Sequence, residues 1–263
     1  PGRGMGRVGQ EEPVGSGEGQ AEAQVGGGVG QREAQRRCGD RRERGADSPH
    51  GLFLAVADGL GGHNGGAEAS NIAIGMFVKE AGSFGTLEEL SAFLVEANSR
   101  IVSAADETPE LKGMGTTMTA VLIRGGKAIG GHVGDSRAYL IREGTASKLT
   151  TDHSLAGQLV KSGFLKEDEM ASHPGRYAVV RCLGASEGLE PEMFETPLRK
   201  GDVLVLCTDG FWEYVNDVEM AERFSGSNDL MSVCEDTVRL ANIRGGEDNI
   251  TVVAALIEES DVN

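Results

Sequence analysis

A short apolar run at residues 52–57 stops at the glycine-rich sequence Asp58-Gly59-Leu60-Gly61-Gly62-His63. An apolar run of this length, closed by glycines, predicts a buried strand that ends in a tight loop. Asp58 is then a carboxylate at the end of a rigid element, and the glycines after it let a ligand approach the backbone closely. An isolated Asp-Gly pair after a strand is also typical of a simple turn, so the interpretation depends on whether the construction recurs.

The same construction does recur in the second half of the chain. Asp209 follows an apolar run, Asp248 comes just before one, and Asp135 lies in a glycine-containing turn between two strand-like runs. Singly, each of these aspartates is consistent with a turn. Jointly, carboxylates at strand ends indicate an oxygen-ligand site for hard divalent cations such as Mg²⁺ or Mn²⁺, which often act in pairs and lower the pKa of a shared water.

The remaining pattern predicts an α+β fold. Closely spaced strand-like runs at residues 116–141 are split by glycines, which predicts consecutive antiparallel hairpins. Thr86 and Glu89 form a capping-box pattern at the start of an amphipathic helix. Strands and helices do not alternate regularly, so we expect stacked antiparallel sheets with helices outside them. The predicted strands are 52–57, 116–123, 127–133, 137–141, 202–207 and 250–257, and the predicted helices are 67–80, one starting at Thr86, 154–161 and 229–240.

Residues 1–50 differ in composition from the rest. They contain thirteen Gly and few large apolar residues, and their eight Arg balance eight Asp and Glu. Such a segment buries too little apolar surface to offset the entropy of ordering. We therefore expect residues 1–50 to be largely disordered or a degenerate start of the domain, and residues 51–263 to form the folded domain.

The formal net charge of −16 consequently resides in residues 51–263. This charge disfavours nucleic acid or an anionic membrane as the main partner and suits a site that collects cations. No apolar run approaches the length of a membrane span. The four cysteines form no Cys-x-x-Cys pair, which suits free thiols in a reducing compartment. We expect a cytoplasmic monomer.

Six short motifs follow one another along the chain, and their order is informative. They are Asp58-Gly59-Leu60-Gly61-Gly62-His63, Met114-Gly115-Thr116-Thr117, His132-Val133-Gly134-Asp135-Ser136-Arg137, Thr151-Asp152-His153-Ser154, Thr208-Asp209-Gly210 and Gly246-Glu247-Asp248-Asn249-Ile250-Thr251. In this order they resemble the metal-dependent type 2C (PPM) serine/threonine protein phosphatases, over residues 51–257. Phe211-Trp212-Glu213-Tyr214-Val215 resembles the bacterial branch of that family.

The resemblance implies a central β-sandwich of two antiparallel sheets, flanked by helix pairs on both outer faces, with two Mn²⁺ or Mg²⁺ ions at one end. It implies that Asp58 bridges both ions, that the Gly59 carbonyl binds one of them, and that Asp209 and Asp248 bind the other. Asp135 would help to hold a third, looser ion. Residues 147–175 correspond to the flap beside the family's substrate groove, a surface element that we expect to be mobile.

The N-terminal segment departs from the family pattern. The family opens with an Arg that binds the substrate phosphate, and metal-shell acids follow four and five residues later. Arg7, Glu11 and Glu12 have this spacing, so the resemblance implies phosphate binding by Arg7 and a metal role for Glu11. However, Glu12 replaces the expected Asp, and the connection to Asp58 is unusually long. Ordinary solvated charges are the alternative. The general acid stays unassigned, because Leu60 stands where many eukaryotic members have His.

Three functions fit these observations. The first is a phosphoserine/phosphothreonine phosphatase that acts on phosphorylated proteins and opposes a cognate Ser/Thr kinase. The second is a catalytically impaired phosphatase-like domain that only binds or regulates. The third is a metal-dependent hydrolase of phosphodiesters. The intact Asp58, Asp209 and Asp248 favour the first, because a decayed site would be free to lose them.

Overall fold

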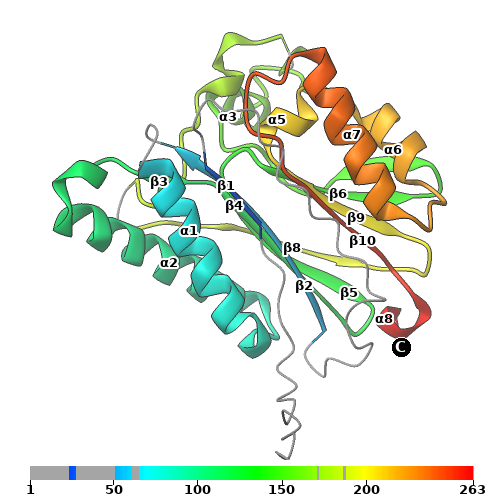
Figure 1. Ribbon diagram of the computed structural model, residues 1–263, viewed down its shortest axis with the longest axis horizontal. Coiled ribbons are helices and arrows are strands. Elements are labelled where there is room, and N and C mark those ends of the chain that lie inside the picture. Colours follow the sequence, from blue (N-terminus) through cyan, green and yellow to red (C-terminus); the bar gives the residue numbers. More distant parts are fainter. Residues whose placement is uncertain (1–23, 28–50, 61–64, 171, 186–187, 263) are drawn as a thin grey trace, which may run out of the picture.

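Two β-sheets stack face to face in the centre of the structure (Figure 1). The computed structural model describes residues 24–27, 51–60, 65–170, 172–185 and 188–262. The first sheet has the strand order β1-β2-β4-β5-β8, with β3 also paired to β2, and the second has the order β10-β9-β6-β7. The strands are β1 (Gln24–Gly27), β2 (Leu52–Leu60), β3 (Gly115–Thr116), β4 (Met118–Arg124), β5 (Lys127–Val133), β6 (Arg137–Arg142), β7 (Thr145–Lys148), β8 (Glu192–Pro197), β9 (Val203–Cys207) and β10 (Val252–Leu256).

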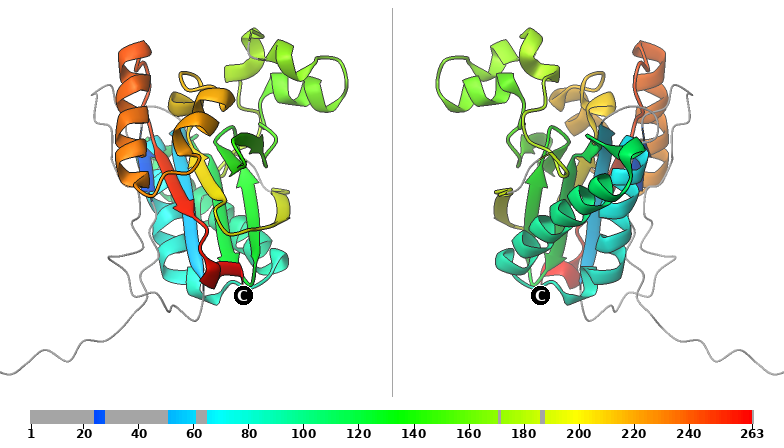
Figure 2. Two further views of the ribbon diagram at one scale, coloured as in Figure 1. Left: turned by 90° about the vertical axis from the view of Figure 1, so that its right-hand side faces the viewer. Right: turned by 90° about the vertical axis from the view of Figure 1, so that its left-hand side faces the viewer.

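Helices cover the outer faces of both sheets. α1 (Gly65–Glu80) and α2 (Leu87–Glu107) pack on the first sheet, and α6 (Asp217–Phe224) and α7 (Leu230–Arg244) pack on the second (Figures 1 and 2). The shorter helices are η2 (Ala81–Ser83), η3 (Pro109–Leu111), α3 (Leu155–Lys161), α4 (Glu167–Met170), η4 (Pro174–Tyr177), α5 (Asp209–Trp212) and α8 (Glu259–Val262). The predicted sandwich with outer helix pairs is confirmed, and the described strand pairs are antiparallel except β1 with β2.

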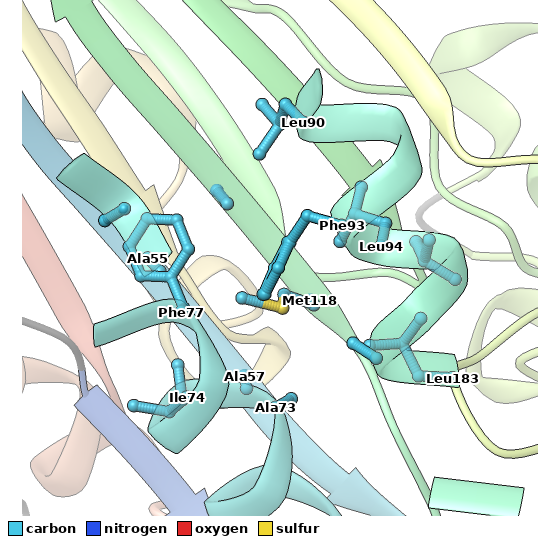
Figure 3. Close-up of a cluster of buried hydrophobic side chains, with 14 of the residues drawn as sticks. Ala55, Ala57, Ala73, Ile74, Phe77, Leu90, Phe93, Leu94, Met118 and Leu183 are labelled. Carbon is cyan, nitrogen blue, oxygen red and sulfur yellow. The ribbon is translucent and has the colours of Figure 1, made fainter. Parts of the chain in front are cut away.

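Alternate residues of β2 face two different hydrophobic cores. Leu54 and Val56 point into the space between the sheets, where they join apolar residues of β9 and β10. Phe53 and Ala55 point the other way, toward the helices α1 and α2. Figure 3 shows this second cluster, in which aromatic and leucine side chains of the helices lie over the alanines of β2. Because both faces of the strand are covered, its sequence is apolar without a polar alternation.

Most locally encoded elements lie where the sequence predicts them. Thr86 caps α2 in a capping box, in which Thr86 Oγ1 accepts the N–H of Glu89 and the Glu89 carboxylate accepts the N–H of Thr86. Ser154 caps α3, and Asp229 caps α7. The predicted strand at 116–123 is divided at Thr117 into β3 and β4. None of the described helices has both the length and the apolar composition that a membrane crossing needs.

The predicted run of consecutive hairpins is wrong at one point. β4 and β5 form a hairpin, but β6 pairs with β9 and β7 in the other sheet rather than with β5. The chain therefore crosses from one sheet to the other at Gly134, whose φ of 115° is in the region that favours glycine. A hairpin turn and a crossover need the same local residues, so the sequence did not distinguish them.

The predicted flap, residues 147–175, includes the last two residues of a strand. Ser147 and Lys148 belong to β7, where Ser147 pairs with Leu140 of β6. Beyond β7, α3 and α4 stand out from the end of the sandwich (Figure 2). We call residues 149–170 the flap segment. The division of the chain at residue 50 stays a prediction; of residues 1–50 the structure describes β1, which pairs in parallel with β2.

Candidate metal centre

The sheet topology gathers the four predicted aspartates at one end of the sandwich. Asp58 lies near the end of β2, and Asp209 begins α5 directly after β9. Val252 at the start of β10 is in register with Cys207 at the end of β9, so the loop with Asp248 reaches the same edge as Asp209. Asp135 lies in the crossover between β5 and β6. Strands from both sheets thus present carboxylates to one region.

The pKa shifts of three of these aspartates reflect their proximity to one another. Burial raises the pKa of Asp58 well above its ordinary value, and the negative charges of Asp209, Asp248 and Asp135 raise it further. Burial and the nearby Asp248 also raise the pKa of Asp209. The pKa of Asp135 rises to about 8, through burial first and then through the charges of Asp209 and Asp152. Mutual repulsion among buried carboxylates is relieved by protons or by bound cations.

The side chains of Asp58 and Asp209 lie close enough to shift each other's pKa. The contact raises the pKa of Asp58 and lowers that of Asp209. Two carboxyl groups this close together repel each other when both are ionised, and a cation between them relieves that repulsion. The arrangement is chemically suited to a divalent ion.

The donor set fits Mn²⁺ or Mg²⁺ in kind. Carboxylate and carbonyl oxygens are the ligands these hard cations prefer, and Mg²⁺ keeps several waters while it binds one or two protein carboxylates. Within the residues that the structure describes, no group of three or more His, Cys, Asp or Glu side chains is arranged to hold one ion.

A threonine pair holds the backbone of Asp58 in place. The Asp58 N–H donates to Thr117 Oγ1 over 3.0 Å, and the Asp58 carbonyl accepts from the Thr117 N–H and the Thr116 hydroxyl, each over 2.8 Å. Thr117 Oγ1 also lies 2.7 Å from Ser136 Oγ, next to Asp135. The sequence placed these residues in motifs but gave them no role. Their membership of the ordered motifs was the available signal.

Two glycines allow the carboxylate-bearing backbones to approach each other. A Cβ atom on Gly66 of α1 would lie 2.7 Å from the carbonyl carbon of Gly59 and 2.8 Å from its oxygen. A Cβ atom on Gly210 would likewise collide with the carbonyl oxygen of Asn249, between the Asp209 and Asp248 loops. Close backbone approach, rather than turn geometry, thus explains glycine at Gly66 and Gly210.

The Asp209 and Asp248 loops are also joined by hydrogen bonds. The Thr208 N–H donates to the Thr251 carbonyl, and the Thr251 N–H donates to Thr208 Oγ1, both over 3.1 Å. Asp209 Oδ1 accepts from the N–H of Gly210, and Asp248 Oδ1 accepts from the N–H of Asn249. Each carboxylate is therefore oriented by the residue that follows it. Arg7 and Glu11, the other predicted site residues, lie outside the described residues.

Comparison with known proteins identifies the class that this fold and site define. The family model of protein phosphatase 2C matches residues 28–250. The chain belongs to the protein phosphatase 2C family.

Individual relatives agree with this assignment. The serine/threonine phosphatase stp of Listeria welshimeri is 36% identical over 208 residues, which cover 76% of this chain and 82% of that protein. The solved serine/threonine phosphatase of S. agalactiae is 36% identical, with a TM-score of 0.71 over 79% of this chain and 87% of that chain. The catalytic domain of PstP, solved in complex with two manganese ions, is 33% identical, with a TM-score of 0.70 over 79% of this chain and 88% of that chain.

Proposed function

We propose that this chain is a metal-dependent phosphoserine/phosphothreonine protein phosphatase that hydrolyses phosphomonoesters with two Mn²⁺ or Mg²⁺ ions. The observation that carries the proposal is the convergence of Asp58, Asp209, Asp248 and Asp135 at one end of the sandwich, in a chain of the protein phosphatase 2C family. Repulsion among these carboxylates, of which Asp58 and Asp135 are buried, favours a cation at this end of the sandwich.

Each aspartate has a separate task in this proposal. Asp58 at the end of β2 would bridge both ions, and the Gly59 carbonyl would bind one of them. Asp209 and Asp248 would bind the other ion, and Asp135 would share a third ion with Asp209. The bound ions supply a hydroxide near neutral pH and stabilise the charge that develops on the phosphate.

The N-terminal residues complete the proposed site. The planar guanidinium of Arg7 is suited to bind the substrate phosphate through two hydrogen bonds, and Glu11 would join the metal shell. Replacement of Arg7 by Ala would then raise the KM for a phosphorylated substrate or lower its turnover. Unchanged KM and turnover would show that Arg7 has no part in the site.

The same proposal extends to partners and location. The substrates would be phosphorylated proteins that a cognate Ser/Thr kinase has modified. The enzyme would act in the cytoplasm as a monomer, with no role in binding nucleic acid or membranes. The net charge of −16 supports the exclusion of polyanionic partners.

Hydrolysis of p-nitrophenyl phosphate tests the proposal first. We expect release of p-nitrophenol with Mn²⁺ and none in excess EDTA. A phosphothreonine peptide should be hydrolysed as well, whereas bis(p-nitrophenyl) phosphate should not. Hydrolysis of the diester in preference to the monoesters would instead indicate a phosphodiesterase. A folded, Mn²⁺-loaded chain that hydrolyses none of these substrates would instead be a phosphatase-like binding or regulatory domain.

A further inference from the structure

Asp248 differs from the other predicted metal ligands in its exposure. Asp58 and Asp135 are buried and Asp209 is half-buried, whereas Asp248 is exposed. It lies in the loop between α7 and β10, which passes close to α5 (Figure 1). An exposed loop has few buried apolar contacts to order it. The position of Asp248 therefore depends on the particular residues that hold this loop.

The ring of Tyr214 holds the beginning of the loop. A Cβ atom on Gly245, the first residue after α7, would lie 2.5 Å from the Tyr214 hydroxyl oxygen and 2.7 Å from Cζ. The phenol ring thus lies directly against the backbone of Gly245. Burial, and then the charge of Glu247, raise the pKa of Tyr214, so its hydroxyl also lies near the residue before Asp248. The threonine hydrogen bonds described above hold the other end of the loop.

Arg244, the last residue of α7, holds the backbone of Tyr214. Its Nη1–H donates to the Tyr214 carbonyl over 2.6 Å. The same guanidinium donates to both carboxylate oxygens of Glu219 in α6, each over 2.6 Å. Such a bidentate pair fixes the orientation of the guanidinium. Both side chains are partly exposed, so the pair contributes little to stability, and its main effect is to join the end of α7 to Tyr214 and to α6.

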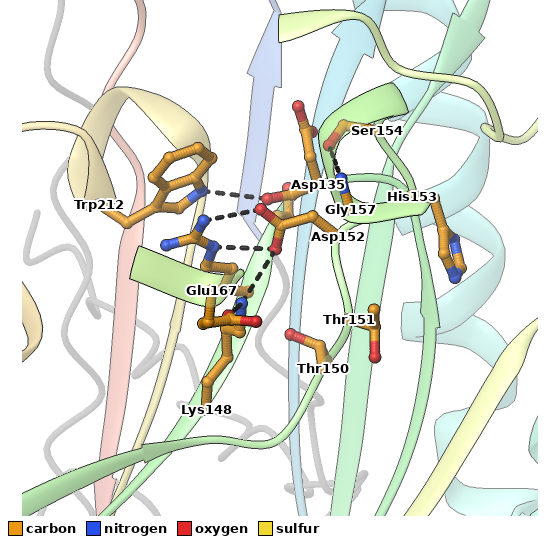
Figure 4. A network of polar contacts seen from close by, with 12 residues as sticks. Asp135, Lys148, Thr150, Thr151, Asp152, His153, Ser154, Gly157, Glu167 and Trp212 are labelled. Atoms are coloured by element: carbon orange, nitrogen blue, oxygen red, sulfur yellow. Dashed lines mark hydrogen bonds and ion pairs between the residues drawn. The ribbon is translucent and has the colours of Figure 1, made fainter. Parts of the chain in front are cut away.

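The residues on either side of Tyr214 are anchored as well. Trp212 donates its Nε1–H to the backbone carbonyl of Asp135 over 3.0 Å (Figure 4). The guanidinium carbon of Arg137 lies 3.5 Å from the centroid of the Trp212 ring, a distance that allows a cation–π contact. Val215 is buried in the core beneath α6 and α7. Tyr214 therefore offers the loop a fixed surface.

We propose that Tyr214, Arg244 and Glu219 form a brace that sets the position of Asp248, and thereby the affinity of the ion that Asp248 binds. These three are positioning residues, since none of them is a ligand in the proposed site. The brace acts on the beginning of the loop, next to the end of α7. The inference rests on the proposed function for the metal role of Asp248, but it concerns metal affinity and loop order rather than hydrolysis.

Helix α7 contains a matched control for Arg244. Arg239 Nη1 donates to Asp236 Oδ1 over 2.8 Å, and both residues are exposed. This ion pair lies within the helix, whereas that of Arg244 connects α7 to α6. Replacement of Arg239 by Ala thus removes the same kind of side chain from the same helix. It should not affect the loop that carries Asp248.

The experiment is a calorimetric Mn²⁺ titration of the wild type, Tyr214→Ala, Tyr214→Phe, Arg244→Ala and Arg239→Ala. Amide hydrogen exchange of residues 245–251 is measured in the same proteins without metal. Tyr214→Phe keeps the ring against Gly245 and removes only the hydroxyl. We expect Tyr214→Ala and Arg244→Ala to weaken one class of Mn²⁺ site about tenfold, the scale on which residues that support ligands act, and to speed exchange in the loop. Tyr214→Phe and Arg239→Ala should match the wild type in both measurements.

Three results would overturn the proposal. One is a wild-type Mn²⁺ isotherm in Arg244→Ala or in a folded Tyr214→Ala. Another is an equal loss of Mn²⁺ affinity in Arg239→Ala, which would make the effect one of general destabilisation. The third is a loss in Tyr214→Phe as large as in Tyr214→Ala, since packing of the ring would then not be the cause. If Tyr214→Ala does not fold, Arg244→Ala still decides.

The same titration separates this inference from the proposed function. A wild type that binds no Mn²⁺ would refute the proposed metal centre and the brace together. A wild type that binds Mn²⁺, with unchanged isotherms in the variants, would refute the brace alone. Because binding is measured directly, a failure to hydrolyse any substrate would leave these outcomes readable.

Discussion

Helix α1 meets the end of β2 at Gly66, with no room for a side chain. A Cβ atom on Gly66 would lie 2.7 Å from the carbonyl carbon of Gly59, 2.8 Å from its oxygen and 2.9 Å from the nitrogen of Leu60. All three are backbone atoms, so no side chain can rotate away. Replacement of Gly66 by Ala must therefore move the start of α1 or the end of β2, which carries Asp58.

The size of this movement follows from the contact distances. Ordinary van der Waals contact for a Cβ atom starts at 3.4 Å. The added methyl group must therefore recede from the Gly59 oxygen by about 0.6 Å, whereas metal–ligand distances tolerate about 0.2 Å. We expect the apparent Mn²⁺ affinity to fall about tenfold to a hundredfold, as when a group that supports a ligand is lost. Overpacking should also cost about 1–3 kcal/mol of stability.

The assay is a Mn²⁺ titration of p-nitrophenyl phosphate hydrolysis, with a calorimetric Mn²⁺ isotherm and a urea unfolding curve. Gly75→Ala is the control, because Gly75 lies in the same helix and a Cβ atom there would meet nothing within 4 Å. That variant should be more stable by about 0.5–1 kcal/mol and bind Mn²⁺ normally. A Gly66→Ala protein that loses stability but keeps the wild-type Mn²⁺ midpoint would refute the reasoning, since the strain would then not reach the ligands.

Three further changes test other parts of the structure. Asp58→Asn should lower Mn²⁺-dependent turnover about a thousandfold, equivalent to about 4 kcal/mol. It should also raise the melting temperature of the metal-free protein, because an amide does not repel the carboxylates of Asp209 and Asp248. Unchanged turnover would contradict the assignment of Asp58 to the site. Burial, followed by the neighbouring His153, lowers the pKa of His132 from 6.5 to about 4. The unfolded chain therefore takes up a proton between these values that the folded chain does not, and stability should fall by about 3 kcal/mol as the pH drops from 6.5 to 4. Between pH 6.5 and pH 4, His132→Gln should therefore lose less stability in urea unfolding than the wild type does. An equal loss of stability in the two proteins would contradict this role of His132. Leu94 of α2 lies in the core between the helices and the first sheet. Leu94→Ala should lose about 2–5 kcal/mol of stability in urea unfolding but keep its turnover at saturating Mn²⁺, because this core supports the site without contributing to it. Reduced turnover in a folded variant would contradict this.

Local elements were predictable because their causes lie within a few residues. The capping box of Thr86 and Glu89 needs only one helical turn, and the structure contains it as predicted. The strand character of β2 and β9 follows from short apolar runs next to glycine. The aspartates at the ends of these strands were predictable as candidates for the same reason. The roles of Arg7 and Glu11 stay predictions.

Partner choice between strands was not predictable in the same way. Gly134, Asp135 and Ser136 suit a hairpin as well as they suit the crossover that the structure contains. The difference lies in whether β6 pairs with β5 or with β9, and that depends on residues far away in the sequence. The contacts of Trp212 with Asp135 and Arg137 depend on this crossover, so the sequence did not predict them either.

By itself, the sequence determined where most of the longer strands and helices lie, that both faces of the central strands are apolar, and which carboxylates stand at strand ends, although it did not predict β7, β8 or α6. These features depend on residue type and on spacing along the chain. The tertiary structure alone decided that Asp58, brought by the first sheet, meets Asp209 and Asp248, brought by the second. The physical reason is that the two sheets stack to bury the apolar residues between them. This stacking brings the strand ends that carry the aspartates together, and a bound cation or proton relieves the resulting charge repulsion.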